Sequence, residues 1–201
     1  MVEISGKYKI GTRRFGSINW IGAWTLYKKE VLRFLIVWIQ TLFSPLITSL
    51  LFLSVLSLAI GNERGNVLGV PFIVFLAPGL IAMQIIQQAF SHSSSSFMIG
   101  KIQGNIVDLI YAPLSAGEVT LAITLASVTR SVLIAIISLL VFYLFIDLEI
   151  KNFITLIVFT LLSAFSLGAL GIIAGLWAEK FDHMATVTNF VIIPLSFLSG
   201  T

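Results

Sequence analysis

The sequence predicts an all-α protein, a polytopic bundle of transmembrane helices with an amphipathic helix at its N-terminal side. Of its 201 residues, 58% are hydrophobic and 10% are charged, whereas soluble domains are about 25% charged. Apolar runs of the length needed to cross a hydrocarbon core about 30 Å thick recur along the chain. Basic residues also crowd before the first of these runs. Composition, run length and charge asymmetry therefore agree on a membrane protein.

The charge asymmetry predicts the orientation. Seven of the twelve basic residues precede the first long apolar run, namely Lys7, Lys9, Arg13, Arg14, Lys28, Lys29 and Arg33. Lys and Arg beside a first span are retained on the cytoplasmic side, so we expect a cytoplasmic N-terminus. The basic stretch adjoins a span and has no domain of its own, so we expect no nucleic-acid partner. Residues 1–17 contain no apolar stretch, so no cleavable signal peptide is visible.

Residues 1–33 are predicted to be a cytoplasmic segment that contains an interfacial helix. Apolar side chains recur there at helical spacing, with Lys28, Lys29 and Arg33 between them; they are Trp20, Trp24, Tyr27, Val31 and Leu35. Such a pattern is typical of a helix that lies in the membrane interface. The bilayer is therefore the first expected partner.

Residues 34–201 are predicted to form one transmembrane domain with five visible spans. The expected spans are about 34–60, 67–90, 119–146, 153–178 and an incomplete one at 186–201. Pro45 is expected to kink the first span, and Pro71 and Pro78 to bend the second. The turns 61–66 and 147–152 are expected outside, and the polar stretches 91–118 and 179–185 inside. Since the fifth run ends at Thr201, we expect the natural polypeptide to continue into a sixth span.

Few polar side chains lie inside these spans. Arg130 either faces the bundle interior or translocation path, or extends to the headgroups of the inner leaflet. Gln84, Gln87 and Gln88 share one helix face, so they either line a polar path or bond a neighbouring helix, and helix bonding is favoured. Small residues at close-packing intervals in the fourth span predict helix packing; they are Ala164, Gly168, Gly171 and Gly175.

The stretch 97–118 is predicted to contain a short amphipathic helix. The apolar stripe of this helix consists of Ile102, Ile106 and Leu109, with Ile110. Its polar positions are Gln103, Asn105 and Asp108, and Pro113 ends the helix. A lipid-surface helix favours a face rich in Lys and Arg, and Lys101 is the only basic residue here. We therefore expect it to dock on a protein. Ile106→Glu or Leu109→Glu should uncouple that partner, whereas Ser94→Glu in the serine run should have little effect.

No residue pattern predicts covalent chemistry. The sequence contains no cysteine, no G-x-x-x-x-G-K-[ST] phosphate loop and no clustered catalytic side chains. We therefore expect no enzymatic activity, no metal site and no cofactor in this chain. The interiors of the five predicted runs also lack Asp, Glu and His, which disfavours an ion-coupled carrier.

Four stretches resemble the ABC-2-type permeases, the membrane subunits of bacterial exporters of polysaccharides, drugs or lipid-linked molecules. They are KKEVLRFLIVWIQTLFSPLI at 28–47, FLAPGLIAMQIIQQAF at 75–90, KIQGNIVDLIYAPLSAGEV at 101–119 and EKFDHMATVTNFVIIPLSFLSGT at 179–201. The A-P-L loop and the final P-L-S-F-L-S-G stretch are the most specific. The resemblance implies six spans, a dimer of permease subunits and separate ATPase subunits that bind the ATP. The chain departs from the family by ending inside the fifth span.

The resemblance also implies roles for particular residues. The segment that matches the ATPase-coupling loop contains Lys101, Ile102, Asn105, Ile106, Asp108, Leu109, Ala112 and Pro113. Independently of the resemblance, Gln84, Gln88 and Arg130 form a possible translocation path, because they are polar side chains inside the predicted spans. We therefore expect the permease subunit of an ATP-binding cassette exporter in the bacterial inner membrane. The alternative is an ion-coupled secondary transporter or channel, which would work without an ATPase. The substrate does not follow from the residues.

Overall fold

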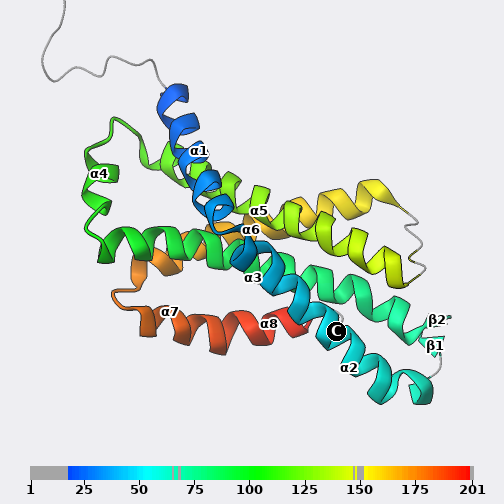
Figure 1. Ribbon diagram of the computed structural model, residues 1–201. Coiled ribbons are helices and arrows are strands. Elements are labelled where there is room, and N and C mark those ends of the chain that lie inside the picture. Colours follow the sequence, from blue (N-terminus) through cyan, green and yellow to red (C-terminus); the bar gives the residue numbers. More distant parts are fainter. Residues whose placement is uncertain (1–17, 65, 68, 147, 149–151, 200–201) are drawn as a thin grey trace, which may run out of the picture.

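The computed structural model describes residues 18–64, 66–67, 69–146, 148 and 152–199 (Figure 1). The N-terminal half contains α1 (Trp20–Ile36), η1 (Ile39–Phe43), α2 (Ser44–Arg64), β1 (Asn66–Val67), β2 (Val70–Pro71) and α3 (Phe72–Ile102). The C-terminal half contains α4 (Ile106–Tyr111), α5 (Ala116–Phe145), α6 (Phe153–Trp177), α7 (Phe181–Val187), η2 (Thr188–Ile192) and α8 (Ile193–Phe197). Segments η1 and η2 are π-helical.

The predicted fold class is confirmed. Within the described residues, four helical stretches are long and apolar enough to cross a membrane: Ile39–Ala59, α3, α5 and α6. The fifth predicted run forms α7, η2 and α8, and it begins at Phe181, before the expected start at 186. The only strands in the described part of the chain are β1 and β2, a two-residue antiparallel ladder between α2 and α3.

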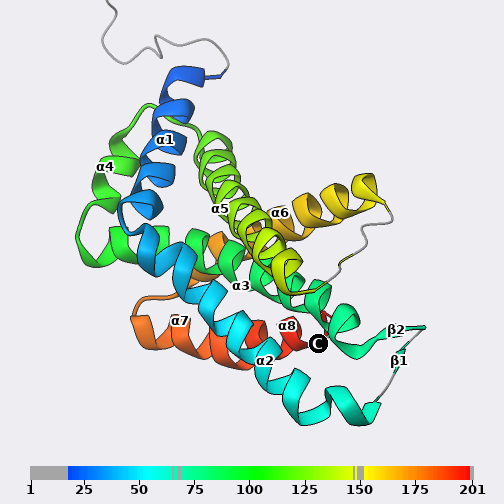
Figure 2. The ribbon, with the colours of Figure 1, turned by 45° about the vertical axis from the view of Figure 1, so that its right-hand side comes forward.

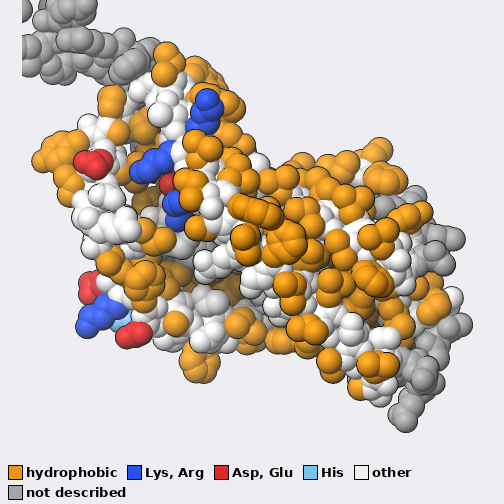
Figure 3. All heavy atoms as spheres, in the orientation of Figure 1, with side chains coloured by type: hydrophobic (Ala, Val, Ile, Leu, Met, Phe, Trp, Pro, Cys, Tyr) orange, Lys and Arg blue, Asp and Glu red, His pale blue; other side chains and the backbone are white. Residues whose placement is uncertain are grey.

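Helix α3 lies at the centre of the bundle and packs along α6 and α5 (Figures 1 and 2). Helix α1 runs steeply across the neighbouring ends of α3 and α5. The short helix α4 and the α6–α7 turn lie at one end of the bundle, and the strands β1 and β2, the end of α5 and the start of α6 lie at the other. On the face shown in Figure 3, the charged side chains of the described residues gather at the α4 end, and hydrophobic side chains cover the middle of the bundle. The α4 end is called the polar end below.

Helix α3 corrects the predicted second span and the loop that follows it. It begins at Phe72, because Asn66–Val67 and Val70–Pro71 pair as strands directly before it, with Gly69 at a φ of 84°. It then continues through the SHSSSS run to Ile102, well beyond the expected end at position 90. The Ser94 and Ser95 hydroxyls donate to the carbonyls of Ser91 and His92, which satisfies them inside the helix. The part of the predicted loop 91–118 up to Ile102 is therefore helix, and the buried residues of this part are His92, Ser93, Ser94, Phe97 and Met98.

The small residues of α6 explain how a serine-rich turn is buried. Ala164, Gly168, Gly171 and Gly175 are all buried, as the packing prediction expects. A Cβ placed on Gly171 would lie 2.5 Å from the Phe90 carbonyl oxygen, and one on Gly175 would lie 2.8 Å from the Ser94 carbonyl oxygen. The backbones of α3 and α6 therefore touch over this stretch, as close packing of small residues allows. The prediction that these residues serve helix packing is confirmed.

Two prolines follow π-helical turns. Pro45 is the second residue of α2, after η1, and Pro194 is the second residue of α8, after η2. Proline has no N–H for the carbonyl four residues earlier, and its ring excludes that carbonyl, so the turn widens to the π form. The expected kink at Pro45 therefore lies in η1.

The first span also begins later than position 34, because α1 continues to Ile36 and Phe34 is buried on its inner face.

Candidate functional site

The short helix α4 divides the predicted apolar stripe between two environments. Ile106 and Leu109 turn inward and pack on a cluster formed by Leu26, Phe97 and Ile123. The outer side carries Val107, Ile110 and Tyr111, of which Ile110 is 72% exposed and Tyr111 84% exposed. Ile102, at the end of α3, is also exposed. The surface available to a partner is therefore different from the predicted stripe, because part of that stripe completes the core of this chain.

Lys101 connects the start of the α4 loop to the end of α6. Its Nζ donates to the carbonyl oxygens of Gly175, Leu176 and Ala178 at 3.0, 2.5 and 2.9 Å. The last carbonyls of a helix have no partner inside the helix, and a lysine ammonium can satisfy them. Lys101 therefore caps α6, a role that its place in the predicted coupling loop did not indicate.

The other end of the loop is bonded to α1. Asn19 donates from Nδ2 to the Pro113 carbonyl at 3.2 Å and from its backbone N to Glu118 Oε1 at 2.5 Å. Glu118 also accepts from the backbone N of Ser115, and Ser115 Oγ accepts from the backbone N of Glu118, which forms a capping box at the start of α5. Sequence reasoning missed Asn19 and Glu118, although the S-x-x-E spacing before the third span was a detectable signal.

The remaining predicted coupling residues lie on the surface of this loop. Asn105 is exposed, and its Nδ2 donates to Gln103 Oε1. The side chain of Asp108 is exposed, while its carbonyl accepts from the backbone N of Ala112. With Lys101 and Asn19 holding its two ends, α4 presents its outer side from a fixed position.

The three glutamines of α3 bond the neighbouring helices α2, α5 and α8. Gln84 Nε2 donates to the Pro45 carbonyl of α2, and Gln84 Oε1 accepts from Ser138 Oγ of α5. Gln87 Nε2 donates to Ser196 Oγ of α8 at 2.9 Å. Gln88 Oε1 accepts from Arg130 of α5 at 2.6 Å. These are the bonds that the helix-bonding interpretation expects, and they direct Arg130 toward α3. A role for Gln84, Gln88 and Arg130 in a translocation path stays a prediction.

A buried ionic cluster joins α1 to α3. Glu30 is 4% exposed, and its Oε2 lies 2.9 Å from Arg33 and 3.7 Å from His92 Nε2. Arg33 also donates to the His92 carbonyl at 3.2 Å, and the His92 ring packs edge-on against Phe34. His92 is fully buried, and neither of its ring nitrogens has a hydrogen-bond partner within the described residues. Glu30 and His92 both lie outside the five predicted runs, and they are buried because α3 continues past position 90 and α1 packs against it.

Sequence reasoning missed Glu30 because it fell in a segment assigned to the membrane surface. Its spacing was informative, since Leu26, Glu30 and Phe34 are four residues apart and share the buried face of α1. No group of three or more His, Asp or Glu in the described ranges is arranged to hold a metal ion.

Replacing Glu30 by glutamine should destabilise the protein. The amide keeps the shape but leaves the Arg33 guanidinium without its anionic partner, and removing one member of a buried pair costs about 3 kcal/mol. The check is the free energy of unfolding in detergent micelles by denaturant titration. Lys28→Gln, which removes a charge from the exposed side of the same helix, should leave that value nearly unchanged. Equal stability of the Glu30 and Lys28 variants would contradict the role of the cluster.

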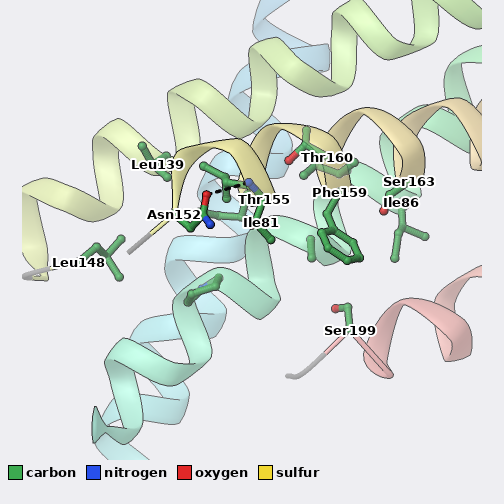
Figure 4. A pocket seen from close by; sticks show the side chains of 14 residues that line it. Ile81, Ile86, Leu139, Leu148, Asn152, Thr155, Phe159, Thr160, Ser163 and Ser199 are labelled. Atoms are coloured by element: carbon green, nitrogen blue, oxygen red, sulfur yellow. Dashed lines mark hydrogen bonds between the residues drawn. The ribbon is translucent and has the colours of Figure 1, made fainter. Parts of the chain in front are cut away.

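A cavity of about 640 Å³ lies between α3, α5, α6 and the end of α8 (Figure 4). The α6 wall is formed by its N-terminal half, from Asn152 to Ser163, and Ser199 faces it from the other side. Asn152 Oδ1 accepts from the backbone N of Thr155 and so is occupied in capping α6. The polar groups of the cavity are hydroxyls and one amide, without a charge, so its chemistry suits an apolar or neutral group.

Four membrane-crossing helices, a steep surface helix and a short helix held at the polar end define a polytopic membrane protein of the permease type. The chain belongs to the ABC-2 type transporter family, whose model matches residues 22–201.

Two curated relatives illustrate this membership. The inner membrane transport permease YadH of Escherichia coli is 29% identical over 183 residues, which cover 91% of this chain and 72% of YadH. Nodulation protein J of Rhizobium leguminosarum bv. trifolii is 25% identical over 196 residues, covering 92% of this chain and 70% of the relative. No solved structure matches significantly.

Proposed function

We propose that the chain is the permease subunit of an ATP-binding cassette exporter and works with a separate ATPase subunit. The observation that carries this proposal is α4. It presents Val107, Ile110 and Tyr111 outward at the polar end, which we expect to lie outside the hydrocarbon core of the bilayer. Exposed apolar side chains of this kind mark interaction surfaces. The sequence has no phosphate loop of its own, so a nucleotide-driven step needs a partner there.

The relatives support the remaining parts of the proposal. YadH is named as an inner membrane transport permease, and we extend that location and activity to this chain. The direction of transport, outward from the cytoplasm or inner leaflet, and a dimer of two permease copies follow from the resemblance to the exporter family. ATP is bound by the partner in this scheme, and no cofactor is assigned to this chain.

The experiment that tests the proposal is co-expression with candidate ATP-binding subunits from the same genome. We expect one of them to co-purify with the permease and to hydrolyse ATP faster in its presence.

The alternative function is an ion-coupled carrier or channel. One specific observation supports this alternative, namely the buried pair of Glu30 and His92, since ionisable groups in a bundle can bind a coupling ion. Transport driven by an ion gradient with no ATPase present would establish that alternative.

The orientation is also testable. We expect a reporter fused after Gly104, which follows α3, to report a cytoplasmic location, and one fused at Gly69, in the β1–β2 turn, to report an external location. The physical reason is that the basic N-terminal segment is retained inside, and α3 separates the two positions by one crossing. Reporter activity in cells measures this directly. A cytoplasmic signal at Gly69 would reverse the proposed topology.

A further inference from the structure

A second cavity, of about 620 Å³, lies between α1 and the first half of α5. The α1 wall is one helix face, formed by Trp20, Ala23, Trp24 and Tyr27 at positions i, i+3, i+4 and i+7. The α5 wall includes Gly117, Leu121, Leu125 and Val128. This space is called the α1–α5 groove below. Its walls are almost entirely apolar, so water is a poor occupant.

Hydrogen bonds between α1 and α5 lie at both ends of the groove. Near the polar end, the backbone N of Asn19 donates to Glu118. Farther along, the hydroxyls of Tyr27 and Thr129 are 2.9 Å apart. Glu118 is the only charged residue in the lining, and both of its carboxylate oxygens accept from backbone amides, of Asn19 and Ser115. The groove therefore offers no charged side chain that requires a polar ligand inside it.

The length of the groove matches one leaflet of a bilayer. Its α5 wall extends from Gly117 to Thr129, which at 1.5 Å per residue is about 18 Å. Half of a hydrocarbon core about 30 Å thick is about 15 Å. The groove begins at the polar end, beside the helix that we assign to the membrane interface, and runs toward the middle of the bundle. An extended acyl chain of the same leaflet has the length and the chemistry to fill it.

The rim of the groove suits a lipid headgroup with a negative charge. Trp20 and Trp24 are 73% and 58% exposed, and tryptophan prefers the level of the headgroups. Lys28 is exposed and follows Tyr27, at the inner end of the α1 wall. Because helical Cα–Cβ bonds tilt toward the N-terminus, its long side chain can extend back toward Trp24 and the rim. A lysine at this level attracts an anionic headgroup. Lys29 follows it and is exposed as well.

We propose that the α1–α5 groove is a binding site for one phospholipid of the leaflet at the polar end, with an acyl chain between α1 and α5 and an anionic headgroup at Lys28. The lipid completes the packing of α1 on the bundle. This site is independent of the translocated substrate and of the ATPase, so its test does not depend on the proposed transport activity.

The test uses the full chain in liposomes of phosphatidylethanolamine and phosphatidylglycerol that contain a trace of phosphatidylglycerol with a diazirine in its acyl chain. After illumination, mass spectrometry of peptides locates the adducts. We expect adducts to concentrate on residues 20–27 and 117–129, and to be sparse on Leu170, Ile173 and Leu176 of α6, which are exposed and line neither cavity. Equal labelling of α6 and of the groove, as unselective contact with bulk lipid produces, would overturn the proposal.

Two variants fill the groove from opposite walls, Ala23→Phe and Leu125→Trp, so that one remains informative if the other fails to fold. Each should remove most of the groove adducts, while Leu140→Phe, at a 60% exposed position of α5 outside the groove, should keep them.

Lys28→Gln should lower labelling by the phosphatidylglycerol probe about fivefold and leave labelling by the matching phosphatidylcholine probe unchanged. Unchanged labelling in both groove-filling variants would refute the chain site, and equal effects of Lys28→Gln on both probes would refute the headgroup contact.

Discussion

Gly171→Ala is expected to lower the free energy of unfolding by about 1–3 kcal/mol, the usual cost of overpacking a well-packed core. The added methyl group would lie 2.5 Å from the Phe90 carbonyl oxygen and 3.2 Å from the Phe90 Cα. Both atoms belong to the backbone of α3, so no side-chain rotation relieves the clash and the two helices must separate. Because α3 packs against α6 along much of its length, the separation affects the centre of the bundle.

The matched control is Gly117→Ala, which adds the same methyl group to α5. A Cβ there has no other atom within 4 Å, and alanine favours a helix over glycine by up to about 1 kcal/mol. This variant should therefore be as stable as the wild type or more stable. Thermal or denaturant unfolding in one detergent compares the two variants directly. A Gly171→Ala protein as stable as Gly117→Ala would show that α3 and α6 are not in backbone contact.

Ile110→Glu is expected to abolish ATP-dependent transport while leaving the fold intact, if the proposed ATPase subunit docks on α4. Ile110 is 72% exposed in the permease, so a carboxylate there stays in water until a partner covers it. Burying a charge in an apolar contact without a partner costs several kcal/mol, whereas burying the isoleucine contributes about 1.5–3 kcal/mol. The measurements are co-purification of the ATPase and its stimulation by the permease.

Two further variants separate docking from folding. Ile110→Leu keeps an apolar side chain on the outer side of α4 and should retain the partner. Ile106→Glu should also lower the thermal stability of the isolated permease, because Ile106 packs on the chain's own core. Full ATPase association by a well-folded Ile110→Glu protein would rule out the outer side of α4 as the docking surface.

Ser94→Glu cannot serve as the tolerant control that the sequence suggested. Ser94 is 3% exposed, and its backbone adjoins Gly175. A glutamate there would be a buried carboxylate without a partner. The prediction failed because a run of serines indicates a solvated loop in isolation. Here the Ser94 and Ser95 hydroxyls bond within α3, and the run packs against the glycines of α6.

The sequence by itself determined the fold class, the number of long membrane helices and the function of the glycines in α6. These properties depend on local composition and on helical periodicity, which are readable from one segment at a time. The expected start of the fourth span, at residue 153, is the first residue of α6, because the polar Asn152 caps the helix and the apolar run begins directly after it.

Only the tertiary structure decided which residues of the polar segments are buried and what they bond. From the sequence, Glu30 is predicted to lie in a surface helix and His92 in a loop. In the structure their side chains contact each other between α1 and α3. Lys101 caps α6, and Ile106 turns inward while Ile110 turns outward. The physical reason is that a polar or apolar side chain is stable wherever its bonds and contacts are satisfied, and its partners here come from helices distant in sequence.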